Sequence, residues 1–143
     1  MQQLDAYVDI DAPPEKVWAV LTDFGSYPEW NPFVVQASGE LKVGERLNVT
    51  LQVPDMKPVS FKPRLLDVEP GRLIRWKGVT WLPGLFDGRH TLSVEPLPDG
   101  RSRFRTHEDV TGILLPFLGN VMRRTQRGFE ALAAAVKKRA ETA

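Results

Sequence analysis

The sequence contains no cysteine and only two histidines, His90 and His107, among its 143 residues. Without cysteine the protein can form neither disulfide bonds nor thiolate zinc sites, and it has no cysteine nucleophile. Two histidines are too few for a histidine-rich metal site. Asp87, Glu108 and Asp109 do not combine with His90 in the spacing of a metal-binding motif, so we expect no metal site.

A charge surplus of either sign and long apolar runs are also lacking. The chain carries 19 Lys and Arg against 18 Asp and Glu, a net charge of +1, which leaves no basic surplus for nucleic-acid binding. No apolar run reaches membrane-spanning length, and the N-terminal MQQLDAYV lacks the basic and then apolar pattern of a signal peptide. We therefore expect a cytoplasmic protein with no nucleic-acid partner and no stable membrane insertion.

Nucleotide-binding and hydrolase motifs are absent as well. The sequence has no GxGxxG, Walker-type loop, HExxH or GxSxG, and no serine has an evident His–Asp pair to activate it. We expect no cofactor. Any chemistry would then be cofactor-free acid–base work, such as an aldol-type cyclisation or a dehydration in which a cavity folds the substrate.

The most informative stretch that is present is an amphipathic segment, residues 116–139. Leu118, Met122, Phe129 and Val136 recur at spacings built from three and four, and basic side chains lie mostly on the other side. This period predicts an α-helix about 35 Å long. A single apolar face of that length needs a broad partner, which the remaining chain can supply as a sheet.

Alternating apolar and polar residues predict seven strands. They span residues 4–10, 33–38, 46–53, 60–68, 72–78, 86–95 and 101–110. Two short helices should follow the first strand, the first of them capped by Asp11. Pro63 disturbs the fourth strand and indicates a bulge or an edge. The order predicts an α+β fold in which a curved antiparallel sheet of about seven strands wraps around the long C-terminal helix, as a single domain over residues 1–143.

Four segments resemble a known superfamily. They are IDAPPEKVWAVLTDFGSYPEWNPF (10–33), RLIRWKG (72–78), LFDGRHTLSVEPLPDGRSRFRTHEDVTG (85–112) and GFEALAAAVKKRAE (128–141). Together they resemble the START/Bet v 1-like (SRPBCC) superfamily, and more narrowly its bacterial polyketide cyclase/dehydrase-like branch. The resemblance covers essentially the whole chain. It implies the helix-grip fold and an apolar ligand held between the sheet and the long helix, but a superfamily of lipid carriers, hormone receptors and cyclases does not by itself name the function.

Loops at one end of the predicted sheet are unusually apolar. In a meander alternate loops lie at the same end, so those near residues 54–59, 79–85 and 111–116 should lie together. Their apolar residues are Met56, Trp81, Leu82, Leu85, Ile113, Leu114 and Leu115. Such loop tips predict either the lip of a cavity or contact surface, or a plug that folds back over the core. The nearby Arg123 and Arg124 are too sparse a charge to favour a membrane surface.

Two polar residues, His90 and Glu108, occupy positions that face the core. The turn at residues 98–100 fits a three-residue hairpin loop, which pairs residues whose numbers sum to 198. The pairs are Val94 with Phe104, Leu92 with Thr106, and His90 with Glu108. A loop two residues longer would set Leu92 opposite Glu108 instead. A buried carboxylate needs a partner, and a histidine is the simplest one. The pair is interpreted either as an acid–base or ligand-orienting dyad, or as a polar pair that lines the cavity or steadies the sheet.

Three other residues lie close to this predicted site. Trp76 is interpreted first as a core residue and second as a ligand contact. The face of Arg64 is unpredictable because it follows Pro63, and an inward Arg64 could meet Glu108 or an anionic ligand. His107 should face solvent, and we assign it no role.

We therefore expect a binding site between the sheet and the long helix. The candidate lining residues are Trp30, Leu51, Trp76, Trp81, Leu85, Phe86, His90, Leu92, Thr106, Glu108, Leu114, Leu118, Met122 and Phe129. The leading hypothesis is binding of a small hydrophobic or amphipathic molecule, lipid- or polyketide-like. One alternative is a cofactor-free cyclase/dehydratase-like enzyme with His90 and Glu108 as the catalytic pair. The other is an interaction module, monomeric or homodimeric, that docks through its apolar loop tips.

Overall fold

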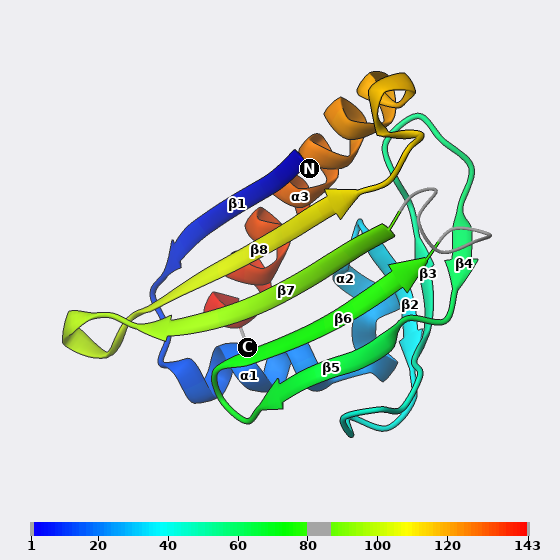
Figure 1. The fold of residues 1–143 in the computed structure, drawn as a ribbon. Helices are drawn as coiled ribbons and strands as arrows, with labels where there is room; N and C mark the ends of the chain where they lie inside the picture. Colours follow the sequence, from blue (N-terminus) through cyan, green and yellow to red (C-terminus); the bar gives the residue numbers. More distant parts are fainter. Residues whose placement is uncertain (1, 80–86, 143) are drawn as a thin grey trace.

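The computed structural model describes residues 2–79 and 87–142 and shows one strand, two short helices, further strands and a long helix in that order (Figure 1). The strands are β1 (Gln2–Ile10), β2 (Val34–Ser38), β3 (Asn48–Leu51), β4 (Val59–Phe61), β5 (Arg64–Glu69), β6 (Leu73–Val79), β7 (Asp87–Pro96) and β8 (Ser102–Thr111). The helices are α1 (Pro14–Thr22), α2 (Tyr27–Trp30) and α3 (Gly119–Thr142), with 3-10 turns η1 (Phe24–Ser26), η2 (Pro98–Gly100) and η3 (Leu115–Phe117). The predicted α+β helix-grip architecture is confirmed.

The strands form two antiparallel sheets that meet at one point. The first sheet has the order β1-β8-β7-β6-β5 and the second the order β2-β3-β4. They meet where Arg46 pairs with Arg64 and where the N–H of Leu47 donates to the carbonyl of Pro63 (3.0 Å). Pro63 itself has no N–H for a ladder bond, and the chain passes from β4 to β5 across it. The predicted strand 60–68 is therefore two strands, and the seven predicted strands become eight.

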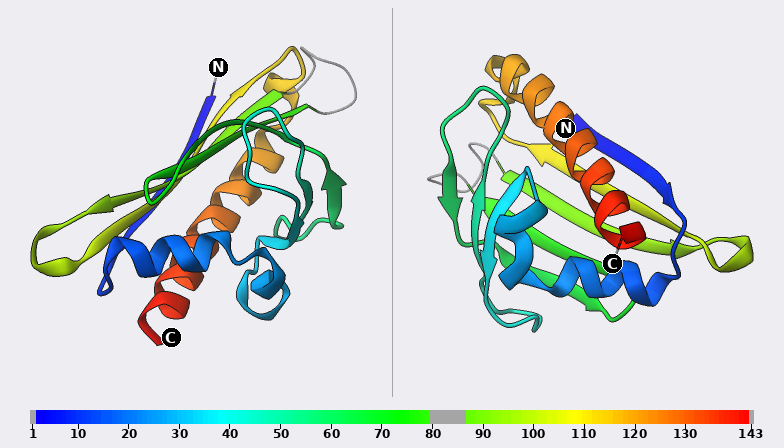
Figure 2. Two further views of the ribbon diagram at one scale, coloured as in Figure 1. Left: turned by 90° about the horizontal axis from the view of Figure 1, so that it is seen from below. Right: turned by 180° about the vertical axis from the view of Figure 1, so that it is seen from behind.

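The long helix α3 crosses the concave face of the five-stranded sheet, and α1 lies against the C-terminal half of α3 (Figure 2). Its buried residues are Met122, Thr125, Gly128, Phe129, Leu132, Ala133, Val136 and Ala140. This is the stripe that the sequence predicts, because a helix returns the same side every 3.6 residues. The core of the protein therefore lies between this stripe and the sheet.

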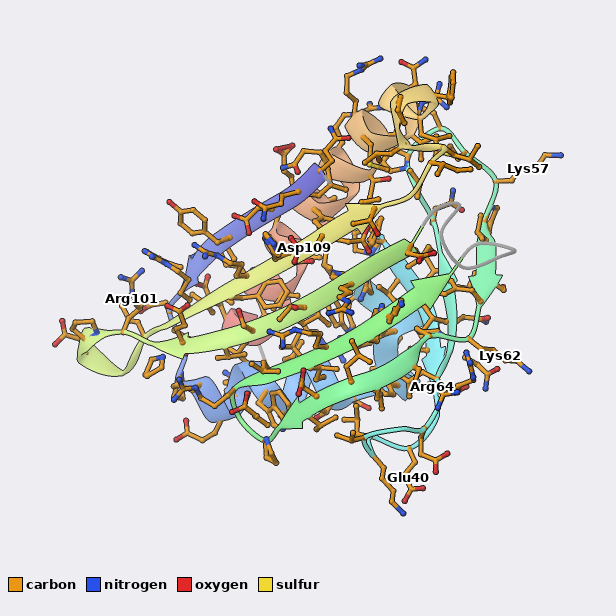
Figure 3. The ribbon with its side chains drawn as sticks, viewed as in Figure 1. Glu40, Lys57, Lys62, Arg64, Arg101 and Asp109 are labelled. Atoms are coloured by element: carbon orange, nitrogen blue, oxygen red, sulfur yellow. The ribbon has the colours of Figure 1, made fainter. Side chains whose placement is uncertain are left out.

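The convex face of the sheet is covered with charged and polar side chains (Figure 3). Arg64, whose face the sequence left open, is exposed and projects outward, because its neighbour Leu65 is buried and side chains alternate along a strand. An inward contact between Arg64 and Glu108 is therefore not formed.

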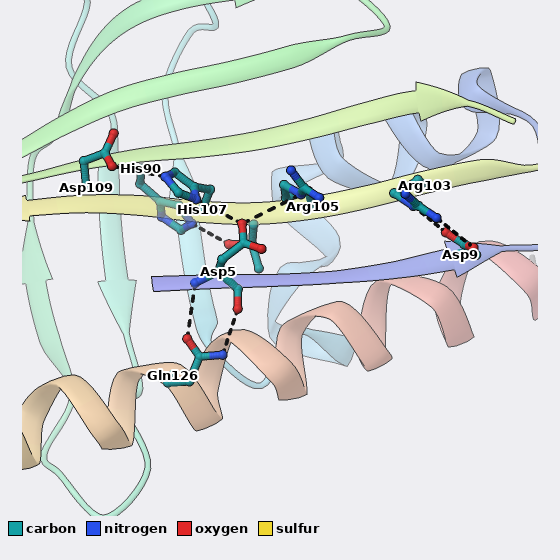
Figure 4. Close-up of polar contacts among 9 residues, drawn as sticks. Asp5, Asp9, His90, Arg103, Arg105, His107, Asp109 and Gln126 are labelled. Carbon is teal, nitrogen blue, oxygen red and sulfur yellow. Dashed lines mark hydrogen bonds and ion pairs between the residues drawn. The ribbon is translucent and has the colours of Figure 1, made fainter. Parts of the chain in front are cut away.

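The free edge of the first sheet is β1, and side chains of α3 bind its outward backbone groups. The side-chain amide of Gln126 accepts a hydrogen bond from the N–H of Asp5 (3.2 Å) and donates one to the carbonyl of Asp5 (2.8 Å) (Figure 4). Lys137 donates to the carbonyl of Asp9 (2.9 Å). Exposed strand edges can pair with other chains, so these contacts reduce the number of backbone groups of β1 that remain free to do so.

Two helices begin differently from the prediction. The first, α1, begins at Pro14 and has no side-chain hydrogen bond at its N-cap, so the predicted cap by Asp11 is wrong. Proline at the first helical position already has the required φ, and the N–H that it lacks would have no partner within the helix. Asp11 instead donates its N–H to the carboxylate of Glu141 (2.9 Å). The sequence predicts that the long helix begins at Pro116, but Pro116 lies in the preceding turn η3 and α3 begins at Gly119.

Gly128 offers a test of how closely the helix packs. A Cβ built at Gly128 would lie 2.5 Å from Cδ1 of Phe33 and 3.3 Å from Cδ of Pro54. Replacing glycine by alanine inside a helix normally stabilises it by about 1 kcal/mol. We expect the opposite sign here: Gly128→Ala should lower the free energy of unfolding by about 1–3 kcal/mol, because it overpacks the core. Urea unfolding measures this, and a variant as stable as the wild type would contradict the packing.

The matched control for this prediction is the double variant. Phe33→Leu in the Gly128→Ala background removes the ring atoms that the new methyl group would meet. The double variant should therefore lose less stability than the sum of the two single variants, as expected for residues in contact.

Candidate functional site

His90 lies on β7 at the centre of the concave face, where its ring contacts two aromatic side chains. It stacks on Phe129 of α3 with the ring centroids 5.0 Å apart and the planes at 8°. Trp76 of β6 meets it edge to face at 5.2 Å, and Phe33 meets Phe129 in the same way at 5.4 Å. His90 is only 3% exposed. This aromatic cluster, which comprises Phe33, Trp76, His90 and Phe129, joins the long helix to the sheet.

The register of β7 and β8 is the predicted one. His90 pairs with Glu108, and Leu92 pairs with Thr106. The hydrogen bond of His90, however, goes to the diagonal neighbour: its Nε2 lies 2.7 Å from Oγ1 of Thr106 (Figure 4). None of the hydrogen bonds between described residues joins His90 to Glu108, so the two residues are neighbours in the sheet without a hydrogen bond between them.

Glu108 lies two residues further along β8 from Thr106, with its carboxyl group over the backbone of Gly88. A Cβ built at Gly88 would come within 2.9 Å of Oε2 of Glu108, so the glycine provides the space that the carboxyl group occupies. Burial raises the pKa of the Glu108 carboxyl to about 7, while the charge of His107 opposes this shift and that of Asp109 adds to it. The group is thus divided between its neutral and ionised forms near neutral pH. Gly88 is not among the predicted site residues, because only the folded sheet places the Glu108 carboxyl against it.

His90 is shifted in the opposite sense. Burial, together with a smaller effect of the charge of His107, lowers the pKa of its imidazole to about 3. The ring is therefore neutral at ordinary pH and offers one donor and one acceptor nitrogen. It can orient the Thr106 hydroxyl or a polar atom of a ligand, but it does not form an ion pair with Glu108.

The predicted lining residues fall into three groups. Those buried on the concave side are Trp76, His90, Leu92, Thr106, Met122 and Phe129. Those partly buried are Trp30, Leu51, Glu108, Leu114 and Leu118. Trp81, Leu85 and Phe86 lie outside the described residues. The structure thus brings His90, Thr106, Trp76 and Phe129 together, and the His90 ring contacts the other two rings between the helix and the centre of the sheet.

A hollow of about 630 Å³ lies elsewhere, between the η1–α2 segment and the second sheet. Phe24 and Pro28 line it on one side, and Val49 and Phe61 line it on the other. Its volume is within the range of small-molecule sites. None of the predicted lining residues borders it. The break of the strand at Pro63, which sets β4 apart from β5, was the one sequence signal that this region differs from a continuous sheet.

The apolar loop tips near the start of α3 are unequally exposed. Ile113 and Phe117 are 71% and 82% exposed, whereas Leu114 is half-buried. The neighbouring loop is held to the helix by an ion pair between Asp55 and Arg127 (3.1 Å). Docking through this end of the molecule stays a prediction.

His107 lies on the convex face, outside the interior site. Its Nδ1 lies 3.0 Å from Oδ1 of Asp5 and its Nε2 lies 3.1 Å from Oδ1 of Asp109 (Figure 4). It is half-buried between these carboxylates rather than free in solvent, but it does not line the interior.

A family model described as polyketide cyclase/dehydrase and lipid transport matches residues 1–141. The chain belongs to this family. Similar solved structures include the Zhui aromatase/cyclase from Streptomyces sp. R1128, with a TM-score of 0.79 and 18% identity over 98% of this chain and 93% of that one. A START superfamily protein from Mycobacterium smegmatis has a TM-score of 0.74 and 19% identity over 97% of both chains. A protein from Thermus thermophilus has a TM-score of 0.75 and 18% identity over 97% of both chains.

At 18–19% identity these structures show that the chain has a START-like fold. They do not show which ligand it binds or whether it catalyses a reaction. No curated protein matches the sequence. Within residues 2–79 and 87–142, no helix is long and apolar enough to cross a membrane, and no three His, Asp or Glu side chains are grouped so that they could hold a metal ion.

His90 and Glu108, whose pKa values are shifted in opposite senses, should change the free energy of unfolding with pH in opposite directions. Glu108 has a pKa of about 7 when folded against 4.5 as the ordinary value, so its contribution is complete below pH 4.5 and is lost as the pH rises through about 7. His90 has a pKa of about 3 when folded against 6.5 ordinarily, so its contribution is complete above pH 6.5 and is lost as the pH falls toward 3. The two slopes oppose each other between pH 4.5 and 6.5.

Single substitutions should expose these slopes. Relative to the wild type, Glu108→Gln should lose stability as the pH falls from 6.5 to 4.5, and His90→Gln should gain stability over the same interval. Each slope should reach up to about 1.4 kcal/mol per pH unit. Urea unfolding at several pH values measures both, and the double variant should return to the wild-type slope. Parallel slopes in the two single variants would show that the assigned protonation states are wrong.

Proposed function

We propose that this protein binds a small hydrophobic or amphipathic molecule, lipid- or polyketide-like, between the sheet and α3. The observation that carries the proposal is the buried hydrogen bond between His90 and Thr106 inside a wall formed by Trp76, Leu92 and Phe129. Small-molecule sites are mostly apolar and hold a few placed polar groups that orient the ligand. Membership in the polyketide cyclase/dehydrase and lipid transport family supports the same ligand class.

The ring of Phe129 occupies the space in front of His90, so a ligand that reaches His90 has to displace it. Phe129 lies parallel to the imidazole at 5.0 Å and is itself 1% exposed. A phenylalanine ring turned aside by rotation about χ1 would leave an apolar space that faces the imidazole. The ligand would then replace the ring stack with an equivalent apolar contact and gain hydrogen bonds from His90 and Thr106.

Substitutions at Phe129 test this arrangement. Phe129→Leu should increase the affinity for the neutral apolar probe N-phenyl-1-naphthylamine several-fold, because it enlarges the space, whereas Phe129→Trp and Leu92→Trp should block uptake. Phe104→Leu is the matched control, since Phe104 is equally buried but forms no ring contact with His90. Each Phe→Leu change should cost about 1 kcal/mol of stability. Unchanged uptake in all the Phe129 and Leu92 variants would remove the cavity from these positions.

The first experiment to make is a direct search for a bound ligand. A native mass spectrum of the freshly purified protein should show an adduct on the order of a few hundred daltons, the mass of a molecule that fills a typical small-molecule site. The adduct should disappear on denaturation, and organic extraction would identify its chemistry.

The second candidate function is that of a cofactor-free cyclase/dehydratase-like enzyme. The observation in its favour is the Glu108 carboxyl, whose pKa of about 7 suits proton transfer at neutral pH. The similar Zhui protein is an aromatase/cyclase. In this proposal Glu108 transfers the proton, and the neutral His90 orients the substrate through a hydrogen bond, because its pKa is too low for it to act as a cation.

Turnover of a polyketide-like substrate would separate the two candidates. Glu108→Gln should lower kcat by about 10²–10⁴-fold while binding survives, since glutamine cannot transfer the proton but has nearly the same side-chain shape as glutamate. His90→Ala should also abolish turnover. Asp67→Asn is the control, because Asp67 pairs with Arg75 (2.9 Å) and is not among the charges that shift the pKa of Glu108, and it should leave kcat unchanged. If Glu108→Gln and His90→Ala both retain full activity, these residues have no catalytic role.

A further inference from the structure

A row of four basic side chains crosses the convex face of the sheet, on the side opposite α3. Arg46 pairs with Arg64, Arg64 with Lys77, and Lys77 with Arg89, so each lies directly opposite the next across neighbouring chain segments. The three arginines are exposed and Lys77 is partly exposed. Figure 3 shows Arg64 projecting outward where the two sheets meet. We call these four residues the basic row.

Several other charges on the convex face form ion pairs, but in the part of the chain that the structure describes the four residues of the basic row do not. Arg103 and Asp9, for example, form an ion pair of 2.7 Å. Among the described residues no ion pair includes a member of the basic row. The guanidinium of Arg46 donates to the backbone carbonyl of Lys62 (2.9 Å) instead. The row is therefore a set of cations without carboxylates of its own.

The carboxylate nearest to the row in the sheet register is already engaged. Asp109 lies directly opposite Arg89, but its Oδ1 lies 3.1 Å from Nε2 of His107. Like charges directly opposite each other on neighbouring strands destabilise a sheet. The basic row thus lowers the stability of the free protein, and an anionic partner that covers it would remove this penalty.

We propose that the basic row binds an acidic α-helix of a partner protein, laid across the strands. Neighbouring strands lie about 4.8 Å apart, so the row extends over roughly 14 Å. Side chains on one face of a helix recur every three or four residues, which is about 5–6 Å along its axis. Four carboxylates with this spacing can meet the four cations, and each arginine can bind a carboxylate with two hydrogen bonds. This surface is separate from the interior site, because it lies on the other face of the sheet.

The surroundings of the row favour a protein partner over a lipid surface or a nucleic acid. Among the described residues, none of the exposed large apolar side chains lies on β5, β6 or β7, whereas peripheral membrane binding combines charge attraction with apolar insertion. A net charge of +1 and a short row of cations give little counterion release on nucleic acid.

The test uses the whole protein and a fluorescent, alanine-rich helical peptide with glutamate at i, i+4, i+7 and i+11. Anisotropy should show saturable binding that weakens as salt is added. Lys77→Glu and Arg64→Glu should each weaken binding about tenfold or more, because a like charge then faces the peptide. Arg72→Glu makes the same charge change at an exposed arginine outside the row, and its affinity should stay within about twofold of the wild type.

A second measurement separates a binding surface from a merely solvated face. Lys77→Glu should raise the midpoint of thermal unfolding by about 1–4 °C, because it replaces repulsion with attraction across the sheet. A stabilised variant that loses peptide binding supports the proposal. Equal peptide binding by Lys77→Glu and the wild type would overturn it, as would equal binding of a peptide with its glutamates at consecutive positions. Binding only to phosphatidylserine vesicles or to duplex DNA would overturn it as well.

Discussion

The stack of the Phe129 ring on His90 is the contact on which the rest of the structure depends, because it joins the long helix to the middle of the sheet. The helix can approach this closely only because Gly128 has no side chain to meet Phe33, which in turn packs edge to face on Phe129. The same stack excludes water from the imidazole, and burial without water is what lowers the pKa of His90. One contact therefore sets the helix position and the protonation state of the central polar residue.

Burial acts on both polar groups of the interior in favour of their neutral forms. His90 is held neutral with a hydrogen bond to Thr106, while Glu108 is held near its point of half-protonation with space provided by Gly88. Unpaired charge in an apolar interior is expensive, so a neutral pair is the less costly arrangement of these residue types. The arrangement also leaves hydrogen-bonding groups that a ligand can use, which links the stability of the interior to its proposed function.

The two faces of the sheet are specialised in different ways. The concave face is apolar with a few hydrogen-bonded polar groups, as expected for a member of a family of polyketide cyclase/dehydrase and lipid transport proteins. Several charges of the convex face form ion pairs, whereas the four residues of the basic row form none among the described residues. The side chains of α3 also bind the free edge at β1, so the helix that closes the interior protects the sheet as well.

The order of elements, the amphipathic face of α3 and the pairing of His90 with Glu108 follow from the sequence alone, because hydrophobic period and hairpin length are local properties. The break at Pro63 is local in the same sense. The tertiary structure decided the rest. It directed His90 to Thr106 instead of Glu108, since the stack on Phe129 orients the imidazole. It also turned Arg64 outward and aligned it with cations of three other segments, because only the folded sheet brings residues distant in sequence to one face.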